Sequence, residues 1–249
     1  MMPPTSIDGT DITGATIDGT DVQEITVDGQ TVFTAGPPRP PSGVAYYTFN
    51  NADTSGATAI DVWGSNNGTI SGATTGVTGA NDTYNTAEAY NFDGLNDFVD
   101  TGFIPNTNSF SFSCFFKPES GSGTQYLIGN PSVSGDLNHT AGFGVRFVDG
   151  NVNVLSGSGN FNGFNGSSLA LNTYHHVVVT HGTNWNIYID GTIDATSSIV
   201  YDVTDVEAYI GASDNYGDNF DGSIDDVRYY DKELTSTEVS DLYNTGSIL

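Results

Sequence analysis

Beyond residue 43, the chain consists of short apolar segments separated by clusters of Gly, Asn, Asp and Ser. Many segments alternate apolar with polar side chains, which is the period of a β-strand with one buried face. Short strands with turn residues between them predict an all-β sandwich. The clearest predicted strands are 44–49, 96–102, 109–117, 125–129, 143–148, 151–155, 174–181, 184–190, 207–211 and 223–230. Asp-Gly pairs within 148–151 and 189–192 predict tight hairpin turns.

One helix is predicted, near the end of the chain. Thr235 and Glu238 have the spacing of a capping box, in which each side chain bonds the backbone N–H of the other residue. The apolar side chains that can then pack one face onto a sheet are Leu234, Val239, Leu242 and Tyr243. We therefore expect a short helix that covers one end of the sandwich.

The first 36 residues carry a repeat with a spacing of ten residues. Its copies are Ile7-Asp8-Gly9-Thr10, Ile17-Asp18-Gly19-Thr20 and Val27-Asp28-Gly29-Gln30. An Asp-Gly pair flanked by β-branched residues predicts a tight turn between strands, here of four to six residues, forming a meander. A segment this short cannot bury enough surface to offset its ordering entropy. We therefore predict an assembly module that forms a homo-oligomer through residues 1–36 or binds a neighbouring protein. A disordered tail, or a strand added to the chain's own sandwich, is the alternative.

A proline-rich segment separates this repeat from the remainder. Residues 37–43, PPRPPSG, predict a stiff, extended hinge. The predicted organisation is therefore a repeat segment at 1–36, a hinge at 37–43 and a β domain at 44–249.

The charge of the chain excludes some partners. Asp and Glu total 30, Lys and Arg total 5, and the formal net charge is −25. Such a chain cannot neutralise phosphates, so nucleic acid is an unsuitable partner. No segment approaches the roughly 20 apolar residues of a membrane span, so membrane insertion is not expected. Molar salt screens repulsion between carboxylates, which favours a protein of an extreme halophile. An ordinary acidic secreted protein is the alternative, although the first residues do not form a secretory signal.

Several segments, in their order along the chain, resemble a known family. They are YYTFNNADTSGATAIDVWGSNNGTISG, AYNFDGLNDFVDTG, TYHHVVVTHGTNWNIYIDGT and FDGSIDDVRYYDKELTSTEVSDLYN. Together they resemble laminin-G-like members of the concanavalin A-like jelly-roll superfamily, over residues 44–246. The resemblance implies a sandwich of two antiparallel sheets with one short C-terminal helix. The segment IDGTDVQEITVDGQTVFTA resembles the N-termini of structural proteins of tailed viruses of halophilic archaea.

Enzymes of this superfamily place carboxylates together on one strand. Retaining glycoside hydrolysis needs two carboxyl groups about 5–5.5 Å apart. No two of the six glutamates share a predicted strand, and adjacent Asp225 and Asp226 are expected to face opposite sides of theirs. We therefore predict that the chain is not an enzyme.

Histidines, a cysteine and acidic residues of the predicted strands are the candidate metal ligands. His175 and His181 fall on one face of their predicted strand and His176 on the other, which argues against a transition-metal site. Cys114 is expected to be a buried structural thiol. The family resemblance implies a structural calcium, held by Asp225 and by backbone groups near Asn50, Asp93 and Gly94. The alternative is that Asp225 caps a turn or faces solvent.

Aromatic residues in two predicted loops suggest a sugar-binding rim. Phe161 and Phe164 lie among Asn and Gly in 155–168, and Tyr216 lies between Asp214 and Asp218 in 212–223. Exposed rings with polar neighbours are what sugar stacking and hydroxyl recognition require. Alternatively, the rings fold back onto the core.

These features predict a non-enzymatic virion surface protein of a halophilic archaeal tailed virus, either a capsid turret or decoration or a tail-fibre component. Its expected partners are other virion proteins and host-surface glycans, and its expected location is the virion surface. A cell-surface or secreted carbohydrate-binding adhesin is the alternative, and a glycan-cleaving enzyme is a third possibility.

Overall fold

The computed structural model describes most of the chain beyond residue 38. It covers residues 39–248 apart from 82–85, 106, 131, 134–139, 158–160, 203–205 and 214–217, and it also covers the strand residues between 6 and 34. The chain divides into two compact units, Met1–Arg39 and Pro40–Leu249.

The first unit contains three small β-hairpins. Their strands are β1 (Ser6–Ile7), β2 (Thr10–Asp11), β3 (Thr16–Ile17), β4 (Thr20–Asp21), β5 (Glu24–Val27) and β6 (Gln30–Thr34). The pairs that close the hairpins are Ile7–Thr10, Ile17–Thr20 and Val27–Gln30. Each Asp-Gly pair therefore joins two antiparallel strands, as the repeat predicts.

The predicted meander is not what the repeat forms. Within the described residues, each strand pairs only inside its own hairpin, and β1 to β4 have two residues each rather than four to six. Asp and Gly, which are depleted in strands, recur in every ten-residue repeat and leave few residues for longer strands.

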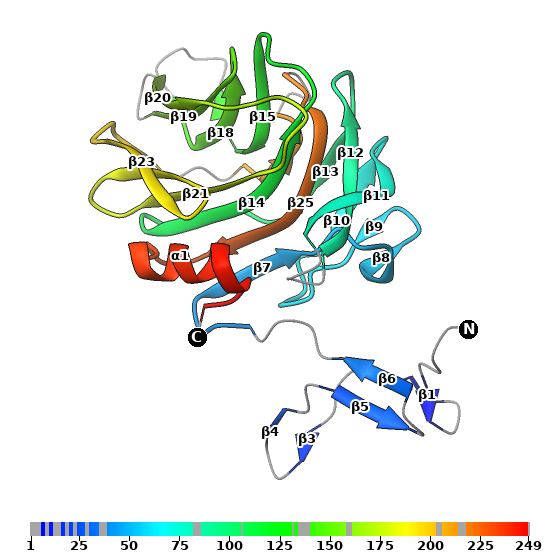
Figure 1. Cartoon of the computed structure of the whole chain (residues 1–249). Helices are drawn as coiled ribbons and strands as arrows, with labels where there is room; N and C mark the ends of the chain where they lie inside the picture. The colour runs from blue at the N-terminus through cyan, green and yellow to red at the C-terminus, as the bar shows by residue number, and fades with distance from the viewer. Residues whose placement is uncertain are drawn as a thin grey trace. The chain divides into compact units, whose positions relative to one another are not determined.

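The second unit is a sandwich of two antiparallel sheets with a helix outside one of them (Figure 1). The first, called the β14 sheet, has the order β11-β12-β25-β14-β21-β22-β23, with β7 also paired to β25. Its strands are β7 (Gly43–Tyr47), β11 (Thr74–Asn81), β12 (Thr86–Asp93), β14 (Phe110–Pro118), β21 (His175–His181), β22 (Trp185–Ile189), β23 (Thr192–Ser197) and β25 (Asp221–Tyr230).

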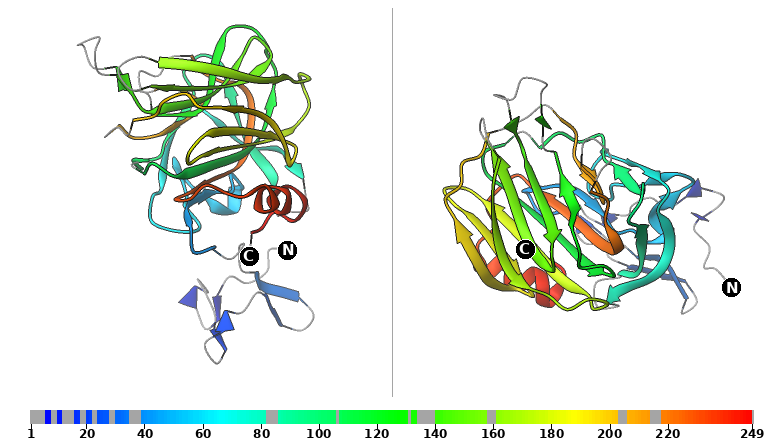
Figure 2. Two further views of the ribbon diagram at one scale, coloured as in Figure 1. Left: turned by 90° about the vertical axis from the view of Figure 1, so that its left-hand side faces the viewer. Right: turned by 90° about the horizontal axis from the view of Figure 1, so that it is seen from above.

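The second sheet, called the β18 sheet, has the order β20-β19-β18-β15-β24-β13-β10-β9-β8. Its strands are β8 (Thr54–Ser55), β9 (Thr58–Ala59), β10 (Gly68–Ser71), β13 (Phe98–Asp100), β15 (Thr124–Gly129), β18 (Phe143–Val148), β19 (Asn151–Gly157), β20 (Phe161–Ser168) and β24 (Tyr209–Ile210). A short 3-10 helix, η1, spans Asn51–Asp53, and a two-stranded ladder pairs β16 (Ser132–Val133) with β17 (Thr140–Ala141). Figure 2 (right) looks down on the β18 sheet. The all-β, two-sheet fold with one short C-terminal helix is confirmed.

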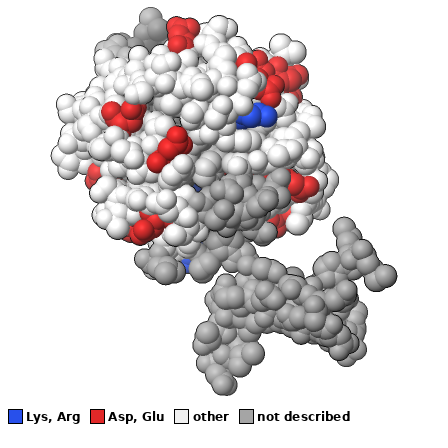
Figure 3. Space-filling view, in the orientation of Figure 1, with Lys and Arg blue, Asp and Glu red and all other residues white. Residues whose placement is uncertain are grey.

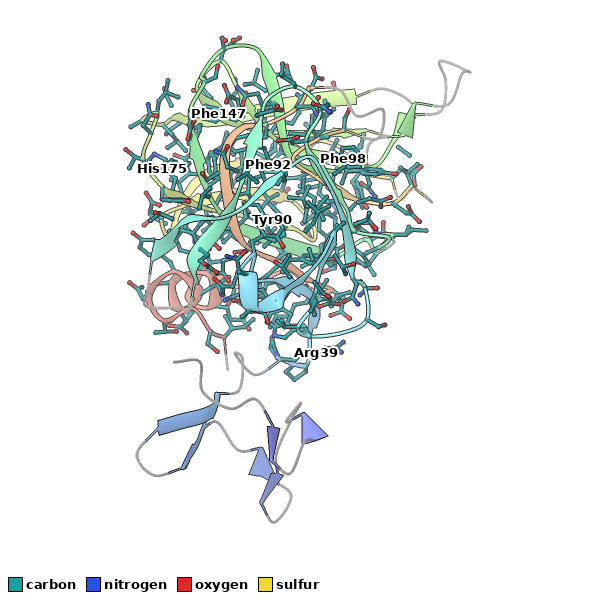
Figure 4. The ribbon with its side chains drawn as sticks, turned by 90° about the vertical axis from the view of Figure 1, so that its right-hand side faces the viewer. Arg39, Tyr90, Phe92, Phe98, Phe147 and His175 are labelled. Carbon is teal, nitrogen blue, oxygen red and sulfur yellow. The ribbon has the colours of Figure 1, made fainter. Side chains whose placement is uncertain are left out.

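The main core lies between the two sheets. Strand β14 directs Phe110, Phe112, Cys114 and Phe116 into it, which is the alternation expected of its sequence. From β12, Tyr90 and Phe92 are fully buried within the body of the domain (Figure 4), and the ring of Tyr90 stacks on that of Phe49 at 4.1 Å. Cys114 is fully buried, as expected of a structural thiol, and burial raises the pKa of its thiol.

A second core lies on the other face of the β14 sheet, beneath helix α1 (Ser236–Thr245). The helix begins with the predicted capping box, because Thr235 Oγ1 accepts from the Glu238 N–H and Glu238 accepts from the Thr235 N–H. It ends at Gly246, whose left-handed backbone (φ 68°) suits glycine. Its buried side chains are Val239 and Leu242. Within the described residues, no helix is long and apolar enough to cross a membrane.

Candidate functional site

The outer face of the β18 sheet carries a row of polar side chains. Tyr126 of β15 pairs with Arg146 of β18, Arg146 pairs with Asn153 of β19, and Asn153 pairs with Asn165 of β20. Residues directly opposite one another in a ladder project to the same face, so these four residues from four adjacent strands lie side by side. The neighbours of Arg146 and Asn153 along their strands point inward, since Val145, Phe147, Val152 and Val154 belong to the main core. We call these four residues the polar row.

Hydrogen bonds connect the polar row from strand to strand. Arg146 donates from Nε and from Nη2 to Oδ1 of Asn153, at 3.0 and 2.6 Å. Asn153 donates from Nδ2 to Oδ1 of Asn165 at 2.6 Å. The Cζ atom of Arg146 lies 5.7 Å from the centre of the Tyr126 ring, a cation–π distance. The guanidinium is thus held by an amide on one side and by an aromatic ring on the other.

Two glycines make room for the Tyr126 ring. A Cβ atom on Gly144 would lie 2.4 Å from Cε1 of Tyr126, and one on Gly129 would lie 2.8 Å from its Cδ1. Gly129 and Gly144 are paired in the same ladder, so together they form a shallow floor on which the ring lies. Any larger side chain at Gly144 would displace the ring that supports Arg146.

Exposure varies along the polar row and is greatest at Asn165, on the edge strand β20. Tyr126 and Asn153 are buried, Arg146 is partly exposed and Asn165 is exposed. A guanidinium donates five N–H bonds and an amide both donates and accepts. The polar row can therefore bond a polar ligand lying across β18 to β20 without a side chain having to be reordered first.

The two predicted rim residues whose side chains the structure describes, Phe164 and Asp218, lie in different surroundings. Segment 155–168 is not a loop, because most of it belongs to strands β19 and β20. Phe164 is partly buried against the main core, and Phe161 lies in β20, where its side chain is outside the described residues. Asp214 and Tyr216 also lie outside the described residues, whereas Asp218 is exposed and accepts the Tyr126 N–H at its backbone carbonyl.

The predicted calcium ligands are spread along the β14 sheet and beyond it. Asp225 lies opposite Phe115 of β14, whereas Asp93 lies opposite Asp221, at the start of β25. Four residues of strand span about 13 Å, whereas two oxygens that coordinate the same calcium lie no more than about 5 Å apart. Gly94 donates to the carbonyl of Phe220, farther still along the chain from Asp225.

The last of the predicted calcium ligands, the backbone of Asn50, already accepts hydrogen bonds within the protein. The carbonyl of Asn50 accepts the N–H of Asp53 at 3.0 Å and the hydroxyl of Thr54 at 2.9 Å. Among the described residues, no group of three or more His, Cys, Asp or Glu is placed to hold a metal ion. The four residues therefore do not fit one calcium site, and calcium binding stays a prediction.

Asp225 is instead a buried carboxylate with one unsatisfied oxygen. Its side chain is 0 % exposed, Oδ2 accepts the Ala80 N–H at 2.9 Å, and Oδ1 has no hydrogen-bond partner. A β-bulge in β25 follows, since Phe115 pairs with Asp225 but Ser113 pairs with Arg228, and Asp226 has a φ of 55°. The bulge breaks the simple alternation that was expected for Asp225 and Asp226, and both are buried.

The histidines of β21 do not converge, as their alternation predicts. His175 and His181 contact rings of the main core, Phe116 and Phe110. His176 contacts Phe115 and stacks on Tyr243 of helix α1, on the other face of the sheet. His139 lies outside the described residues.

The polar row is not evident from the sequence, because the sequence of β20 predicts a loop. Gly-Asn-Phe-Asn-Gly-Phe-Asn-Gly, residues 159–166, is typical of turns rather than of strands. The available signal was the polar residue at the centre of two neighbouring strands, Arg146 in FGVRFV and Asn153 in NVNVL. Strict alternation places both on the solvent face.

Solved structures with this fold include parts of carbohydrate-active enzymes. Domain 4 of AbnA, a GH43 extracellular arabinanase from Geobacillus stearothermophilus solved with arabinotriose, matches 80 % of this chain and 97 % of its own, at 22 % identity and a TM-score of 0.59. The sialidase of Trypanosoma rangeli solved with sialic acid matches 89 % of this chain at 16 % identity and a TM-score of 0.62. This chain spans only 35 % of the sialidase. Among proteins of curated function, none matches this chain in sequence.

These matches contradict the prediction that the chain is not an enzyme. That prediction used the absence of a carboxylate pair on one predicted strand. The structures that share the fold include a domain of a glycoside hydrolase and part of a sialidase, so the fold occurs in enzymes as well as in non-enzymes. At identities of 16–22 %, the likeness shows a common fold and does not carry an activity with it.

The family itself follows from the sequence match. Residues 91–240 match the laminin G-like family model of the concanavalin A-like lectin/glucanases superfamily. The matched segment begins in β12 and ends in α1, so it includes every strand of the polar row. Because it covers more than half of the chain, this protein belongs to the laminin G-like family of the concanavalin A-like lectin/glucanases superfamily.

Proposed function

We propose that this chain binds glycans through the polar row on the outer face of the β18 sheet. The observation that carries the proposal is the connected set of Arg146, Asn153 and Asn165 on that face, in a protein with a carbohydrate-binding type of fold. Sugar hydroxyls both donate and accept hydrogen bonds. The polar row offers both kinds of group, already held in place by one another.

We further propose that the β domain is carried on a larger particle by residues 1–36. The three hairpins support this, since isolated two-stranded hairpins are at best marginally stable in water and gain from a partner. The net charge of −25 favours a halophilic setting, and the sequence resemblance of this segment favours a tailed virus of halophilic archaea. The proposed location is accordingly the virion surface, with other virion proteins and host-surface glycans as partners.

The test is binding of the full-length protein to an immobilised panel of neutral and acidic oligosaccharides in about 1 M NaCl, where the Debye length is roughly 3 Å. The panel includes arabinotriose, the oligosaccharide bound to the arabinanase domain. Asn165→Ala removes the exposed end of the polar row and is expected to weaken binding. Thr192→Ala, at an exposed position of β23 in the other sheet, is the matched control and should bind like the parent.

Binding of no glycan on the panel, or equal binding by the Asn165→Ala protein and the parent, would overturn the proposal. Equal melting temperatures of the two variants and the parent would ensure that a loss of binding reflects the site rather than the fold.

A further inference from the structure

The basic residues of this chain are few, and most of those in the β domain are paired with acids. Lys117 lies 3.6 Å from Glu119, Arg228 lies 2.9 Å from Asp226, and Lys232 is paired with Glu238. With 30 acidic residues and 5 basic ones, an acidic partner is the ordinary arrangement here. Figure 3 shows acidic groups scattered widely over one face of the β domain and very little basic surface.

Arg146 departs from this pattern. Within the part of the chain that the structure describes, its contacts are the Asn153 amide oxygen and the Tyr126 ring, and it forms no ion pair with a carboxylate. Both of these partners are neutral. They fix the position of the guanidinium but leave its positive charge unneutralised.

The geometry also leaves donors available. A guanidinium has five N–H groups, and Arg146 uses one on Nε and one on Nη2 for Asn153. The remaining N–H groups, including both on Nη1, have no partner among the described residues. The side chain is partly exposed. Parallel N–H groups of a fixed, charged guanidinium match the two oxygens of a carboxylate.

We propose that Arg146 binds the carboxylate of an acidic sugar residue, such as a hexuronic acid, within a glycan that lies across the polar row. This inference rests on the proposed glycan-binding function and adds the chemical class of the ligand. Arg146 supplies the charge-assisted hydrogen bonds, Tyr126 and Asn153 hold it in position, and Asn165 is left to bond hydroxyl groups of the same glycan.

The matched ligands for the test are an oligogalacturonate and its methyl ester, which share a backbone and differ in the carboxylate charge. Binding of each to the full-length protein is measured in about 1 M NaCl, where the chain's net negative charge is screened. We expect the parent to prefer the free acid, and Arg146→Gln to lower affinity for it by about ten- to hundredfold with little change for the ester. Lys117→Gln, which changes the net charge equally, should leave both affinities unchanged.

A second variant tests the mechanism without removing Arg146. Asn153→Asp keeps an acceptor oxygen against the guanidinium and adds a negative charge that neutralises it. It should therefore abolish the preference for the free acid while the fold, followed by melting temperature, persists. A sulfated oligosaccharide of equal length serves as a further arm, and its tighter binding than the oligogalacturonate would overturn the assignment to a carboxylate.

The failures of the two proposals are distinguishable. Equal binding of acid and ester by a parent protein that still loses affinity on Asn165→Ala would overturn the acidic ligand and leave glycan binding intact. Binding of no oligosaccharide at all would overturn both.

Discussion

The guanidinium of Arg228 donates a hydrogen bond to the carboxylate of Asp226 at 2.9 Å, and both side chains are about 1 % exposed. Arg228 also donates to the carbonyl of Gly246 at 2.6 Å and lies 4.3 Å from the ring of Tyr46. This one side chain therefore connects β25, the C-terminal end of helix α1 and β7. The ion pair lies in the β-bulge that separates the part of β25 paired with β12 from the part paired with β7.

Removal of one partner of this pair should strongly destabilise the fold. Arg228→Met leaves Asp226 buried and uncompensated, and we expect it to lower the free energy of unfolding by about 3–5 kcal/mol. The exposed pair of Lys117 and Glu119 is the control, since Lys117→Gln should cost no more than about 1 kcal/mol. Urea denaturation measures both. Restoration of stability by adding Asp226→Asn to Arg228→Met would support the charge argument, and a loss of under 1 kcal/mol in the single variant would contradict it.

Asp225 is predicted to destabilise the fold at neutral pH. Burial first, and then the charge of Asp226, raises the pKa of Asp225 well above its usual value. A raised folded-state pKa means that the folded protein holds the proton more tightly. The contribution of Asp225 to stability is therefore greatest at acid pH and is lost as pH rises above about 4. Asp225→Asn should raise the free energy of unfolding near pH 7, with a smaller effect near pH 4.

Urea denaturation in EDTA at the two pH values provides this measurement. Asp231→Asn, at an exposed position just after β25, is the control and should change little at either pH. A less stable Asp225→Asn protein at neutral pH would mean that the charge of Asp225 is compensated in a way that these contacts do not provide.

A calcium ion bound at Asp225 would reverse the expected effect of Asp225→Asn on stability, because the ion would stabilise the charged carboxylate. If calcium binds at Asp225, adding it should raise the melting temperature of the parent protein and leave that of Asp225→Asn unchanged. Chelation by EDTA should then lower the melting temperature of the parent alone. Equal melting temperatures of the parent with calcium and with EDTA, at one salt concentration, would remove calcium from the account of this protein.

His176 should make the fold sensitive to acid. Burial, together with the nearby positive charge of Arg228, lowers the pKa of His176 to about 3. Its neutral form is therefore favoured in the fold, and stability is lost as pH falls from about 6.5 towards about 3, by about 1.4 kcal/mol per pH unit. His176→Gln, which cannot be protonated, should reduce this slope, part of which remains because burial also lowers the pKa of His181. The same change at His175 is the control, and identical slopes for the parent and His176→Gln would contradict the prediction.

The fold could be predicted where local chemistry and packing agree. The alternating Phe110, Phe112, Cys114 and Phe116 specify the inner face of β14, and the Thr235–Glu238 capping box specifies the start of α1. The bulge at Asp226 could not be predicted in this way. The positive φ of Asp226 lies where the strand beside β25 changes from β12 to β7, and this change depends on segments that are distant in the sequence.

The candidate site was harder to predict for a related reason. Asn153 and Asn165 become neighbours only through the register of β19 on β20, and β20 has the composition of a turn. Its pairing with β19 therefore overrides its weak local preference. Phe164 packs on the main core, which is the alternative that the sequence left open for the rim aromatics, because burial of a large aromatic side chain stabilises the fold.

The repeat at the start of the chain leads to the last prediction. Each ten-residue unit forms one hairpin, and within the described residues each hairpin pairs with no other strand. The outer edges of such hairpins present backbone N–H and C=O groups that another strand can bond. Two-stranded hairpins of this size gain little from their own side chains, so copies of the segment or a neighbouring virion protein should stabilise them. We therefore expect the full-length protein to be oligomeric in about 1 M NaCl, and a truncated protein beginning at Pro40 to be monomeric. Light scattering measures both masses. If both proteins are monomeric, and the segment also fails to bind the particle to which the protein belongs, residues 1–36 are not an assembly module.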